Sequence, residues 1–521
     1  MSRDHDRPSR RPTPTAAAVA AAGALASTPA VTTAAPGPEP APFPGRRGAS
    51  GTRRAYAVLL ALCLALAGAL VTAGPARAAA RTVANGVQFR DTSGNPVHAH
   101  GGGVIKVGSY YYWFGEDRNA DNTFRYVDAY RSTDLKNWEF RNHVLTRSSA
   151  AELGTAYIER PKVIYNASTG TFVMWMHKEN GVDYSEARAA VAVSATVDGD
   201  YTYRGSFRPL GSSMSRDITA YVDTDGTAYM VSAANDNYDL HIYRLTADYT
   251  GIAGLVANPW PGGHREAPAL FKRDGVYFML TSGATGWSPN QQQYATATSL
   301  SGPWTPWRNV GDSTAYGSQT AYVLPVTGTS GTSYLYLGDR WGNSFGGTVD
   351  DSRYVWLPLA FPGPTSLSMS WYPEITVDTA AGTVTGTSAT YDTLIARHSG
   401  RCADVTSQSL WQGAQVKQYD CNGGGNQKYW FRSVGGGYYQ MVVRNSSLCV
   451  QENASTVTQE DCDSSAATQQ WSPAASGSYV TLRSRASGEC LDVSGASTAD
   501  SAPIITYTCN GGANQQWTRG T

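Results

Sequence analysis

Four stretches of the chain place a carboxylate or an amide just before an apolar run. They are Glu159 in IERPKVIY, Asp217 in SRDITAYV, Glu266 in HREAPALF and Gln319 in GSQTAYVLPV. Carboxylates gathered in one site can donate a proton to a leaving group and take one from water. A single polar residue at such a place is an ordinary hairpin cap, so the chemistry depends on a fold that brings all four together.

A repeat in the middle of the chain indicates such a fold. Five hairpin-like segments each put a glycine turn before an aromatic, β-branched strand; the turn glycines are Gly108, Gly170, Gly226, Gly275 and Gly331. They lie roughly 50–60 residues apart, which is the length of one four-stranded propeller blade. We therefore expect an all-β fold with a five-bladed β-propeller over residues 79–375. A β-sandwich is the alternative.

The strand before each turn is expected to be the innermost strand of its blade, with its first residues at the central axis. Counting back from each turn glycine leads to His100, Glu159, Asp217, Glu266 and Gln319. A structural role gains nothing from gathering carboxylates in a partly buried space, because like charges repel there. The five in-phase polar residues therefore predict a funnel-shaped site.

Several carboxylates in a sugar-sized funnel are typical of glycoside hydrolysis. One group must be protonated to donate to the leaving oxygen, and another must handle a water on the opposite face. In inverting enzymes the two stand about 6.5–9.5 Å apart. The 31 Tyr and 14 Trp of the chain also suit sugar binding, although most aromatic residues fill β cores.

Longer motifs carry a family resemblance over about residues 83–375. DTSGNPVHAHGGGVIKVGSYYYWFGE, ERPKVIYN, RDITAYVDTDGTAYMV and REAPALFKRDGVYFMLTSGATGW resemble glycoside hydrolase family 43, and more narrowly its exo-β-1,3-galactanase branch. The resemblance implies a five-bladed propeller that acts with inversion. It further implies that Glu266 is the general acid, and that Asp217 tunes the pKa of Glu266 and orients it.

The sequence departs from the wider family at the base. The usual base is an Asp on the first blade, whereas VHAHGGGVI offers His98 and His100 and no carboxylate. The galactanase branch shares this departure, and its resemblance implies that Gln319 manages the water. An amide accepts a hydrogen bond from water, and its imidic-acid tautomer can act as a base. Glu159 is the alternative for this role.

The same resemblance implies further contacts with the terminal sugar. Glu116 in YYWFGE and Tyr184 in GVDYSEA match the branch as hydroxyl or ring contacts, and Thr285 and Trp287 in ATGW are weaker candidates. Blade packing is the alternative role for Trp287.

The sequence indicates no required cofactor. His98 and His100 share one strand face, as a metal pair would, but no third ligand is visible. DTDGT at residues 223–227 is interpreted as a hairpin turn, because the remaining ligands of a calcium loop are absent. A structural calcium ion is not indicated.

A second repeat follows residues 376–389, which are small and polar enough to be a linker. GRCADVTSQSLWQGAQVKQYDCNGGGNQKYW, SSLCVQENASTVTQEDCDSSAATQQW and GECLDVSGASTADSAPIITYTCNGGANQQW align with one another. They resemble a ricin-type β-trefoil lectin, or carbohydrate-binding module family 13, over residues 390–521. Six cysteines permit fifteen pairings. The symmetry of the repeats favours Cys402–Cys421, Cys449–Cys462 and Cys490–Cys509.

The three repeats differ as sugar sites, which need a hydroxyl acceptor, an aromatic platform and an amide. The first has Asp404, Tyr419, Asn422 and Asn426, and the third has Asp492, Tyr507, Asn510 and Asn514. The second has Gln451, Glu460, Asp463 and Thr468 at these places, so it lacks both the acidic acceptor and the platform. We expect sugar binding at the first and third repeats; a purely structural trefoil is the alternative.

The N-terminal region predicts export. Residues 1–54 carry no hydrophobic period and read as a disordered leader, and residues 55–78 read as a signal peptide that ends in the small-residue motif ARA. A membrane anchor is the alternative for this apolar run. Cysteines confined to Cys63 and the trefoil agree with a secreted protein held by disulfides.

The sequence as a whole predicts a secreted glycosidase that acts on β-1,3-galactan from the non-reducing end and is held on polysaccharide by its trefoil. Exo action rests on the resemblance alone. Zero net charge and 16% charged residues argue against nucleic-acid or acidic-lipid partners, and we expect a monomer without a membrane partner once the signal is removed. The alternatives are a β-xylosidase or α-L-arabinofuranosidase of the same family, and a non-catalytic lectin.

Overall fold

The computed structural model describes residues 79–454 and 456–520. The leader expected at 1–54 and the signal peptide expected at 55–78 lie outside these residues. In the described ranges the regular elements are β-strands and short 3-10 helices, and none of the helices there is long and apolar enough to cross a membrane.

Five antiparallel four-stranded sheets follow one another along the chain, each with its strands in sequence order. The first holds β2 (His100–Val107), β3 (Tyr110–Arg118), β4 (Phe124–Ser132) and β5 (Glu139–Thr146). The second holds β6 (Tyr157–Asn166), β7 (Thr171–Glu179), β8 (Arg188–Ser194) and β9 (Thr202–Phe207). The third holds β10 (Ile218–Val222), β11 (Ala228–Ala234), β12 (Asp239–Leu245) and β13 (Ile252–Ala257).

The last two of these sheets complete the series. The fourth holds β14 (Arg265–Arg273), β15 (Val276–Gly283), β16 (Gln293–Ala297) and β17 (Arg308–Asn309), and the fifth holds β18 (Gln319–Gly328), β19 (Gly331–Arg340), β20 (Arg353–Gly363) and β21 (Ser366–Met369). The 3-10 helices of this region are η1 (Ala151–Leu153), η2 (Pro209–Gly211), η3 (Gly342–Phe345) and η4 (Val349–Asp351).

The glycine turns join the first two strands of each sheet, as the sequence predicts. Between β14 and β15, Asp274 and Gly275 form a two-residue turn with φ of 49° and 80°. Asp-Gly suits this turn, because positive φ at both positions matches the twist of the flanking strands. DTDGT is likewise the turn between β10 and β11.

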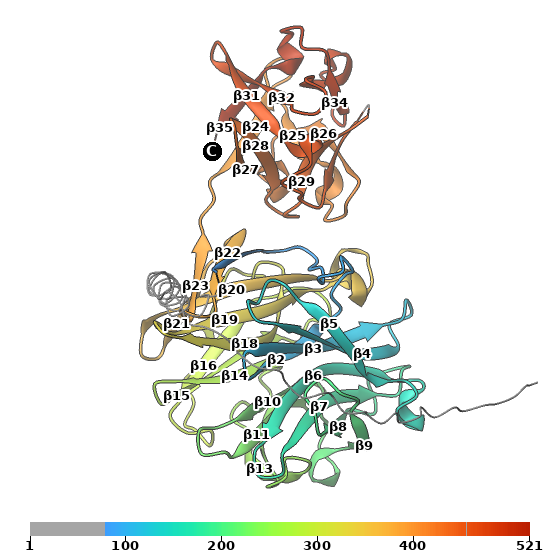
Figure 1. Ribbon diagram of the computed structural model, residues 1–521, viewed down its shortest axis with the longest axis vertical. Coiled ribbons are helices and arrows are strands. Elements are labelled where there is room, and N and C mark those ends of the chain that lie inside the picture. Colours follow the sequence, from blue (N-terminus) through green and yellow to red (C-terminus); the bar gives the residue numbers. More distant parts are fainter. Residues whose placement is uncertain (1–78, 455, 521) are drawn as a thin grey trace, which may run out of the picture. The chain divides into compact units, whose positions relative to one another are not determined.

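The inner strands β2, β6, β10, β14 and β18 contact one another in a closed ring, and Figure 1 shows them side by side in the middle of the propeller. Apolar clusters fill the spaces between successive sheets. Strands with both faces covered carry continuous apolar runs rather than alternating ones. An example is TFVMWMHKE of β7, which is buried after its first residue.

The predicted count of five blades needs correction, because this region contains a sixth sheet. β1 (Arg81–Ala84) pairs with β22 (Glu374–Asp378), which pairs with β23 (Thr383–Thr387). Residues 376–389 were expected to be a linker, but they supply most of β22 and all of β23. Ile375 and Val377 of this sheet pack in one core with residues of the first and fifth sheets. The sixth sheet therefore packs against both the first and the last four-stranded sheets, whose inner strands β2 and β18 are themselves in contact.

Twelve strands form the C-terminal domain, and they join in one sheet network. They are β24 (Tyr391–Ala396), β25 (Cys402–Val405), β26 (Ala414–Tyr419), β27 (Tyr429–Gly435), β28 (Tyr438–Val443), β29 (Cys449–Asn453), β30 (Thr456–Glu460), β31 (Trp471–Ser476), β32 (Tyr479–Ser484), β33 (Cys490–Val493), β34 (Ile504–Tyr507) and β35 (Trp517–Gly520). The 3-10 helices are η5 (Thr406–Gln408), η6 (Gly425–Gln427), η7 (Ala467–Gln469), η8 (Ser494–Ala496) and η9 (Ala513–Gln515).

The three predicted disulfides are confirmed. Cys402 pairs with Cys421, Cys449 with Cys462, and Cys490 with Cys509, so each repeat closes one loop of its own. Trp471 and Trp517 end the second and third repeats in the shared core, and Tyr429 takes the corresponding place in the first.

Candidate active site

A cavity of about 400 Å³ opens at the end of the propeller where the inner strands begin. Glu159, Asp217, Glu266 and Gln319 all line it, as the sequence predicts. The fifth predicted residue, His100, does not line it. Its ring is fully buried, stacks on Tyr354 and pairs with Asp339, because the first inner strand turns this side chain into the protein.

Backbone bulges aim the site residues into the cavity. The inner strands of three sheets shift register directly after His100, Glu159 and Glu266, and β18 shifts one residue later, after Thr320. The residues that follow His100, Glu159 and Glu266 have positive φ, with values of 61° for Gly101, 55° for Arg160 and 52° for Ala267. A bulge re-aims side chains, and a non-glycine residue at positive φ is a strained conformation that is found mostly at functional sites. Two of these three residues are not glycine.

Glu266 has the environment of a general acid. Its side chain is 7% exposed, and burial and then the nearby Asp217 raise its pKa to about 8. Asp217 accepts the backbone N–H of Ala267 at 3.0 Å and pairs with Arg160 at 3.0 Å. These contacts fix Asp217 beside the acid. Glu266 therefore keeps its proton near neutral pH, as the donor in glycoside hydrolysis must.

Gln319 contacts the acid directly. Its Nε2 donates to Glu266 Oε1 at 3.0 Å and to Ser282 Oγ at 2.9 Å. Its Oε1 accepts from Arg160 at 2.6 Å and from Trp341 Nε1 at 2.7 Å. Arginine and the indole N–H are donors only, so these two contacts determine which end of the amide is oxygen.

The contact between Gln319 and Glu266 is closer than the sequence predicts. The acid and the group that handles the water were expected to stand about 6.5–9.5 Å apart. At 3.0 Å between Nε2 and Oε1, neither a sugar nor a water fits between them. For Gln319 to handle a water, its side chain has to leave the acid when a sugar enters.

Glu159 is held as a carboxylate. Arg118 and the hydroxyl of Tyr184 donate to its Oε1 at 2.7 and 2.8 Å, and His177 contacts its Oε2 at 2.9 Å. Burial opposes ionisation, but Arg118 and His177 still hold the pKa of Glu159 well below its usual range. A carboxylate with such a low pKa is a weak base, which argues against the alternative assignment of the base to Glu159.

The floor of the cavity also contains Glu116. Arg118 binds its Oε2 through two nitrogens at 2.9 and 2.6 Å, and the backbone N–H of Arg160 donates to its Oε1 at 2.8 Å. A side chain on Gly101 would clash with this oxygen, so the glycine run of the first inner strand makes room for the carboxylate. Glu116 and Tyr184 thus lie in the cavity, as the sequence predicts.

Of the two weaker candidates for sugar contacts, Trp287 lies in the cavity and Thr285 does not. Trp287 lines the cavity, where its ring meets the edge of Trp341 at 5.2 Å between centroids. Thr285 does not line the cavity. Its hydroxyl donates to the carbonyl of Ser288 and accepts from the side chain of Asn290, both in its own loop.

The trefoil repeats one and three have the same local geometry. Asn426 and Gln427 donate to Asp404 Oδ2 at 2.9 and 2.8 Å, and Asn514 and Gln515 donate to Asp492 Oδ2 at 2.9 and 2.9 Å. In both repeats the two amides bind the same carboxylate oxygen, Oδ2. The matching platforms Tyr419 and Tyr507 are 43% and 54% exposed. Asn422 and Asn510 each accept a backbone N–H of the following glycine turn at 2.8 Å.

The second repeat is built differently. Gln469 donates to Gln451 at 2.9 Å, so an amide replaces the carboxylate. Glu460 takes the place of the tyrosine platform and accepts from Thr458 at 2.7 Å. Asp463 caps its own turn, and Thr468 lies in η7.

Comparison with known proteins places this geometry in a family. The model of "Glycosyl hydrolases family 43" matches residues 94–325, and that of "Ricin-type beta-trefoil lectin domain" matches residues 390–517. The solved structure of an exo-β-1,3-galactanase from Clostridium thermocellum is 46% identical, with a TM-score of 0.59. The match covers 84% of this chain and 99% of that one. The chain belongs to glycosyl hydrolase family 43.

Two further proteins are similar at lower identity. An exo-β-1,3-galactanase from Phanerochaete chrysosporium, solved with β-1,3-galactotriose, is 29% identical with a TM-score of 0.60, and the match covers 82% of this chain and 100% of that one. A xylan 1,3-β-xylosidase from a Vibrio species is 25% identical over 201 residues, 34% of this chain and 35% of the relative. The chain thus matches only about a third of the xylosidase.

In this family 43 glycosidase, two arginines and one asparagine of the site were not predicted from the sequence. Arg118 and Arg160 neutralise the carboxylates of the floor, and Asn237 donates to Glu266 Oε2 at 2.9 Å. One signal for Arg118 was available. It stands two positions after Glu116, and residues two apart on a strand share one face. Asn237 comes from the turn before β12, which no local pattern connects to β14.

Two groups of side chains in the described residues have the composition of a metal site. Glu159, His177 and Asp217 form one of them, within the cavity. Both ring nitrogens of His177 face carboxylates, those of Glu159 and Glu179, at 2.9 and 2.8 Å. Although burial opposes it, these contacts raise the pKa of His177 to about 9, so the ring is protonated and offers no lone pair to a metal.

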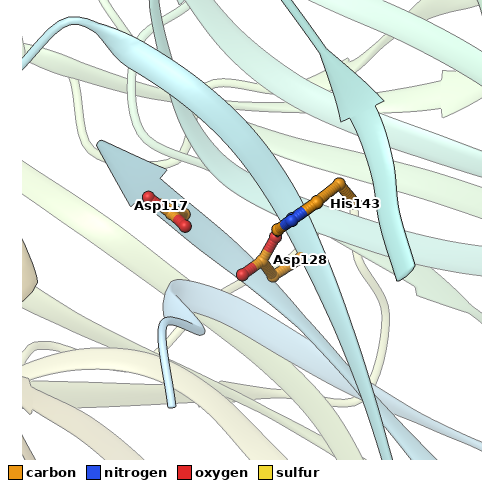
Figure 2. A group of neighbouring side chains, drawn as sticks. All are labelled: Asp117, Asp128 and His143. Atoms are coloured by element: carbon orange, nitrogen blue, oxygen red, sulfur yellow. The ribbon is translucent and has the colours of Figure 1, made fainter. Parts of the chain in front are cut away.

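The second group lies outside the cavity on β3, β4 and β5 and consists of Asp117, Asp128 and His143 (Figure 2). His143 Nδ1 lies 2.5 Å from Asp128 Oδ1, and Figure 2 shows these two side chains pointing at each other. Arg125 contacts both oxygens of Asp117 at 2.6 and 2.8 Å. The guanidinium and the imidazole balance the two carboxylates, so the group is an ion-pair cluster.

Proposed function

We propose that the chain is an exported, monomeric exo-β-1,3-galactanase. It would release galactose from the non-reducing end of β-1,3-galactan with inversion, and its trefoil would bind the polysaccharide. The observation that carries the proposal is the cavity of sugar size in which the nearly buried Glu266 lies with Asp217, Glu159 and Gln319; burial and Asp217 raise the pKa of Glu266. The similarity to the galactanases of Clostridium thermocellum and Phanerochaete chrysosporium supports this substrate.

The proposed reaction begins with binding of the terminal galactose against the floor of the cavity. Glu116, Glu159 and Tyr184 supply acceptors and a donor for its hydroxyls, and Trp287 supplies a ring face. Arg118 and the backbone of Arg160 hold these carboxylates in place, so little reorganisation is needed when the sugar enters.

In the chemical step Glu266 donates its proton to the glycosidic oxygen while the bond from C1 to this oxygen breaks. A water attacks C1 from the opposite face, and Gln319 orients it. The imidic-acid tautomer of Gln319 takes the proton of the water on its nitrogen, because an ordinary amide takes no proton near neutral pH. The hydroxyl proton of this tautomer then passes to the ionised Glu266, which returns both groups to their starting forms. Gln319 reaches this position by exchanging its contact with Glu266 for one with the water. Asp217 keeps the pKa of Glu266 high and thereby holds the proton on the acid until the substrate arrives.

A panel of substrates tests the proposal. The purified enzyme is assayed on β-1,3-galactan, on β-1,3-galactobiose and on nitrophenyl β-galactoside, β-xyloside and α-L-arabinofuranoside. We expect free galactose from the first two, released first as the α-anomer in a proton NMR time course. Turnover of the xyloside or arabinofuranoside alone would replace the galactanase with the commoner activities of the family. Binding without turnover on every substrate would indicate a lectin.

A further inference from the structure

The rim of the cavity has an unusual backbone conformation. Residues Asn235, Asp236 and Asn237 have φ of 50°, 53° and 64°, and His264 across from them has φ of 52°. Four non-glycine residues in the left-handed region at one rim are unusual, because each costs free energy that the surrounding contacts must offset.

Hydrogen bonds tie the two segments of this rim together. The backbone N–H of His264 donates to the carbonyl of Tyr238 at 3.3 Å, and Ala284 donates to the carbonyl of His264 at 3.2 Å. The rings of Tyr238 and His264 pack at 3.8 Å between centroids. Both side chains are nevertheless exposed, Tyr238 by 46%. The rim therefore presents a braced aromatic pair to the solvent.

His264 lines the same cavity as the acid, on its solvent side. His264 stands two positions before Glu266 at the start of β14, and both line the cavity. His264 precedes β14 and is exposed, whereas Glu266 is only 7% exposed, so the ring of His264 lies nearer the solvent than the acid does. Glu116 and Glu159 close the opposite, deep end of the cavity, where their side chains are at most 9% exposed.

This arrangement assigns a direction to the substrate. The terminal sugar occupies the closed floor, and the sugar that leaves has to extend toward the rim from the oxygen that Glu266 protonates. We infer that His264, braced by Tyr238, is the platform for the leaving sugar and that it determines how well this sugar is bound. The inference rests on the proposed glycosidase function and names the second sugar site of the same cavity.

The test compares substrates with and without a leaving sugar. β-Galactosyl fluoride carries only fluoride at the leaving position and so makes no contact with the rim, whereas β-1,3-galactobiose places a galactose there. For His264→Ala we expect kcat/KM on galactobiose to fall about tenfold, with kcat/KM on the fluoride unchanged within about twofold. Tyr238→Ala should lower kcat/KM on galactobiose by a smaller factor. Tyr238→Phe, which keeps the ring, should have the wild-type kcat/KM.

His143→Ala is the matched control, because this histidine is also exposed but lies on β5 outside the cavity. This variant should leave kcat/KM unchanged on both substrates. Thermal unfolding of each variant confirms that the fold is kept. Unchanged kcat/KM of His264→Ala on galactobiose, or an equal loss on the fluoride, would overturn the inference. A wild-type enzyme that cleaves xylobiose and leaves galactobiose intact would overturn the proposed function instead. The platform is then tested in the same way with xylobiose and xylosyl fluoride.

Discussion

At the scale of single residues, the site is an arrangement of charges that gives two carboxylates opposite properties. Glu266 and Glu159 are both nearly buried, yet the pKa of the first is raised and that of the second is lowered. The difference comes from their neighbours. Asp217 faces Glu266, whereas Arg118 and His177 face Glu159. One carboxyl can therefore donate a proton while the other binds hydroxyls as an anion.

The first prediction concerns the acid. In Glu266→Gln the transferable proton is lost, so kcat on β-1,3-galactobiose should fall by about 10²–10⁴-fold. Hydrolysis of β-galactosyl fluoride should persist, because fluoride leaves without protonation. Steady-state kinetics on both substrates measure the effect. Near-normal turnover of galactobiose would remove Glu266 from this role.

The second prediction concerns pH. Glu266 has to be protonated to act, and its pKa is about 8, so kcat/KM on galactobiose should fall as the pH rises through about 8. Asp217→Asn removes the neighbouring charge that raises this pKa, and the alkaline limb should move to lower pH. A pH profile of kcat/KM from 4 to 10 for both proteins measures the shift. An identical alkaline limb in the variant would show that Asp217 does not tune the acid.

The third prediction separates the two candidates for the base. Gln319→Ala should reduce kcat by about 10²-fold or more, because no group then orients the water. Glu159→Gln should mainly raise KM, since the low pKa of Glu159 suits sugar binding rather than proton transfer. If the alanine variant of Gln319 stays active while the glutamine variant of Glu159 is dead, Glu159 is the base.

At the scale of elements, inner strands position the site and the sixth sheet joins the two ends of the propeller segment. Bulges in β2, β6, β14 and β18 place one side chain of each strand out of the regular alternation. At two of these bulges a non-glycine residue, Arg160 or Ala267, adopts a strained left-handed conformation. The sixth sheet joins β1 to β22, so that the start and the end of the propeller segment are hydrogen-bonded to each other.

The fourth prediction tests this junction. Ile375 of β22 is fully buried in the core shared by the first, fifth and sixth sheets. Ile375→Ala should lower the free energy of unfolding by about 2–5 kcal/mol. Thr385→Ala on β23, whose side chain is exposed, is the matched control and should be neutral. Thermal unfolding followed by tryptophan fluorescence compares the two. Equal melting temperatures would mean that the sixth sheet does not stabilise the propeller.

At the scale of the whole molecule, the proposed division of labour is between one catalytic cavity in the propeller and two sugar sites in the trefoil. Weak sites on one domain gain avidity on a long chain, because the second binding event is intramolecular. This applies to the first and third repeats, which keep a carboxylate with a free oxygen beside an exposed tyrosine.

The fifth prediction therefore concerns polymer binding. Asp404→Ala with Asp492→Ala should release the full-length enzyme from insoluble galactan, while kcat/KM on galactobiose stays unchanged because the cavity is untouched. Gln451→Ala is the matched control in the second repeat and should retain binding. A sedimentation assay with the polysaccharide measures retention. Loss of retention in the Gln451 variant, with retention in the double variant, would show that the repeats are ranked wrongly.

The sequence by itself determined what depends on local pattern and on repetition. Turn glycines, apolar strands and in-phase polar residues led to an all-β propeller and to Glu159, Asp217, Glu266 and Gln319 in one cavity. Repeat symmetry led to the three disulfides. These features can be predicted from the sequence because turn chemistry and strand alternation depend on a few neighbouring residues, and a repeat shows the same pattern several times.

Only the tertiary structure decided what depends on contacts between distant strands. β1 and β22 are almost 300 residues apart in the chain, so residues 376–389 looked like a linker although they form most of the sixth sheet. The burial of His100, the contact of Gln319 with Glu266 and the cations beside the carboxylates likewise follow from closing the ring of inner strands. Electrostatic energies depend on distance in space and on burial, and a linear sequence contains neither.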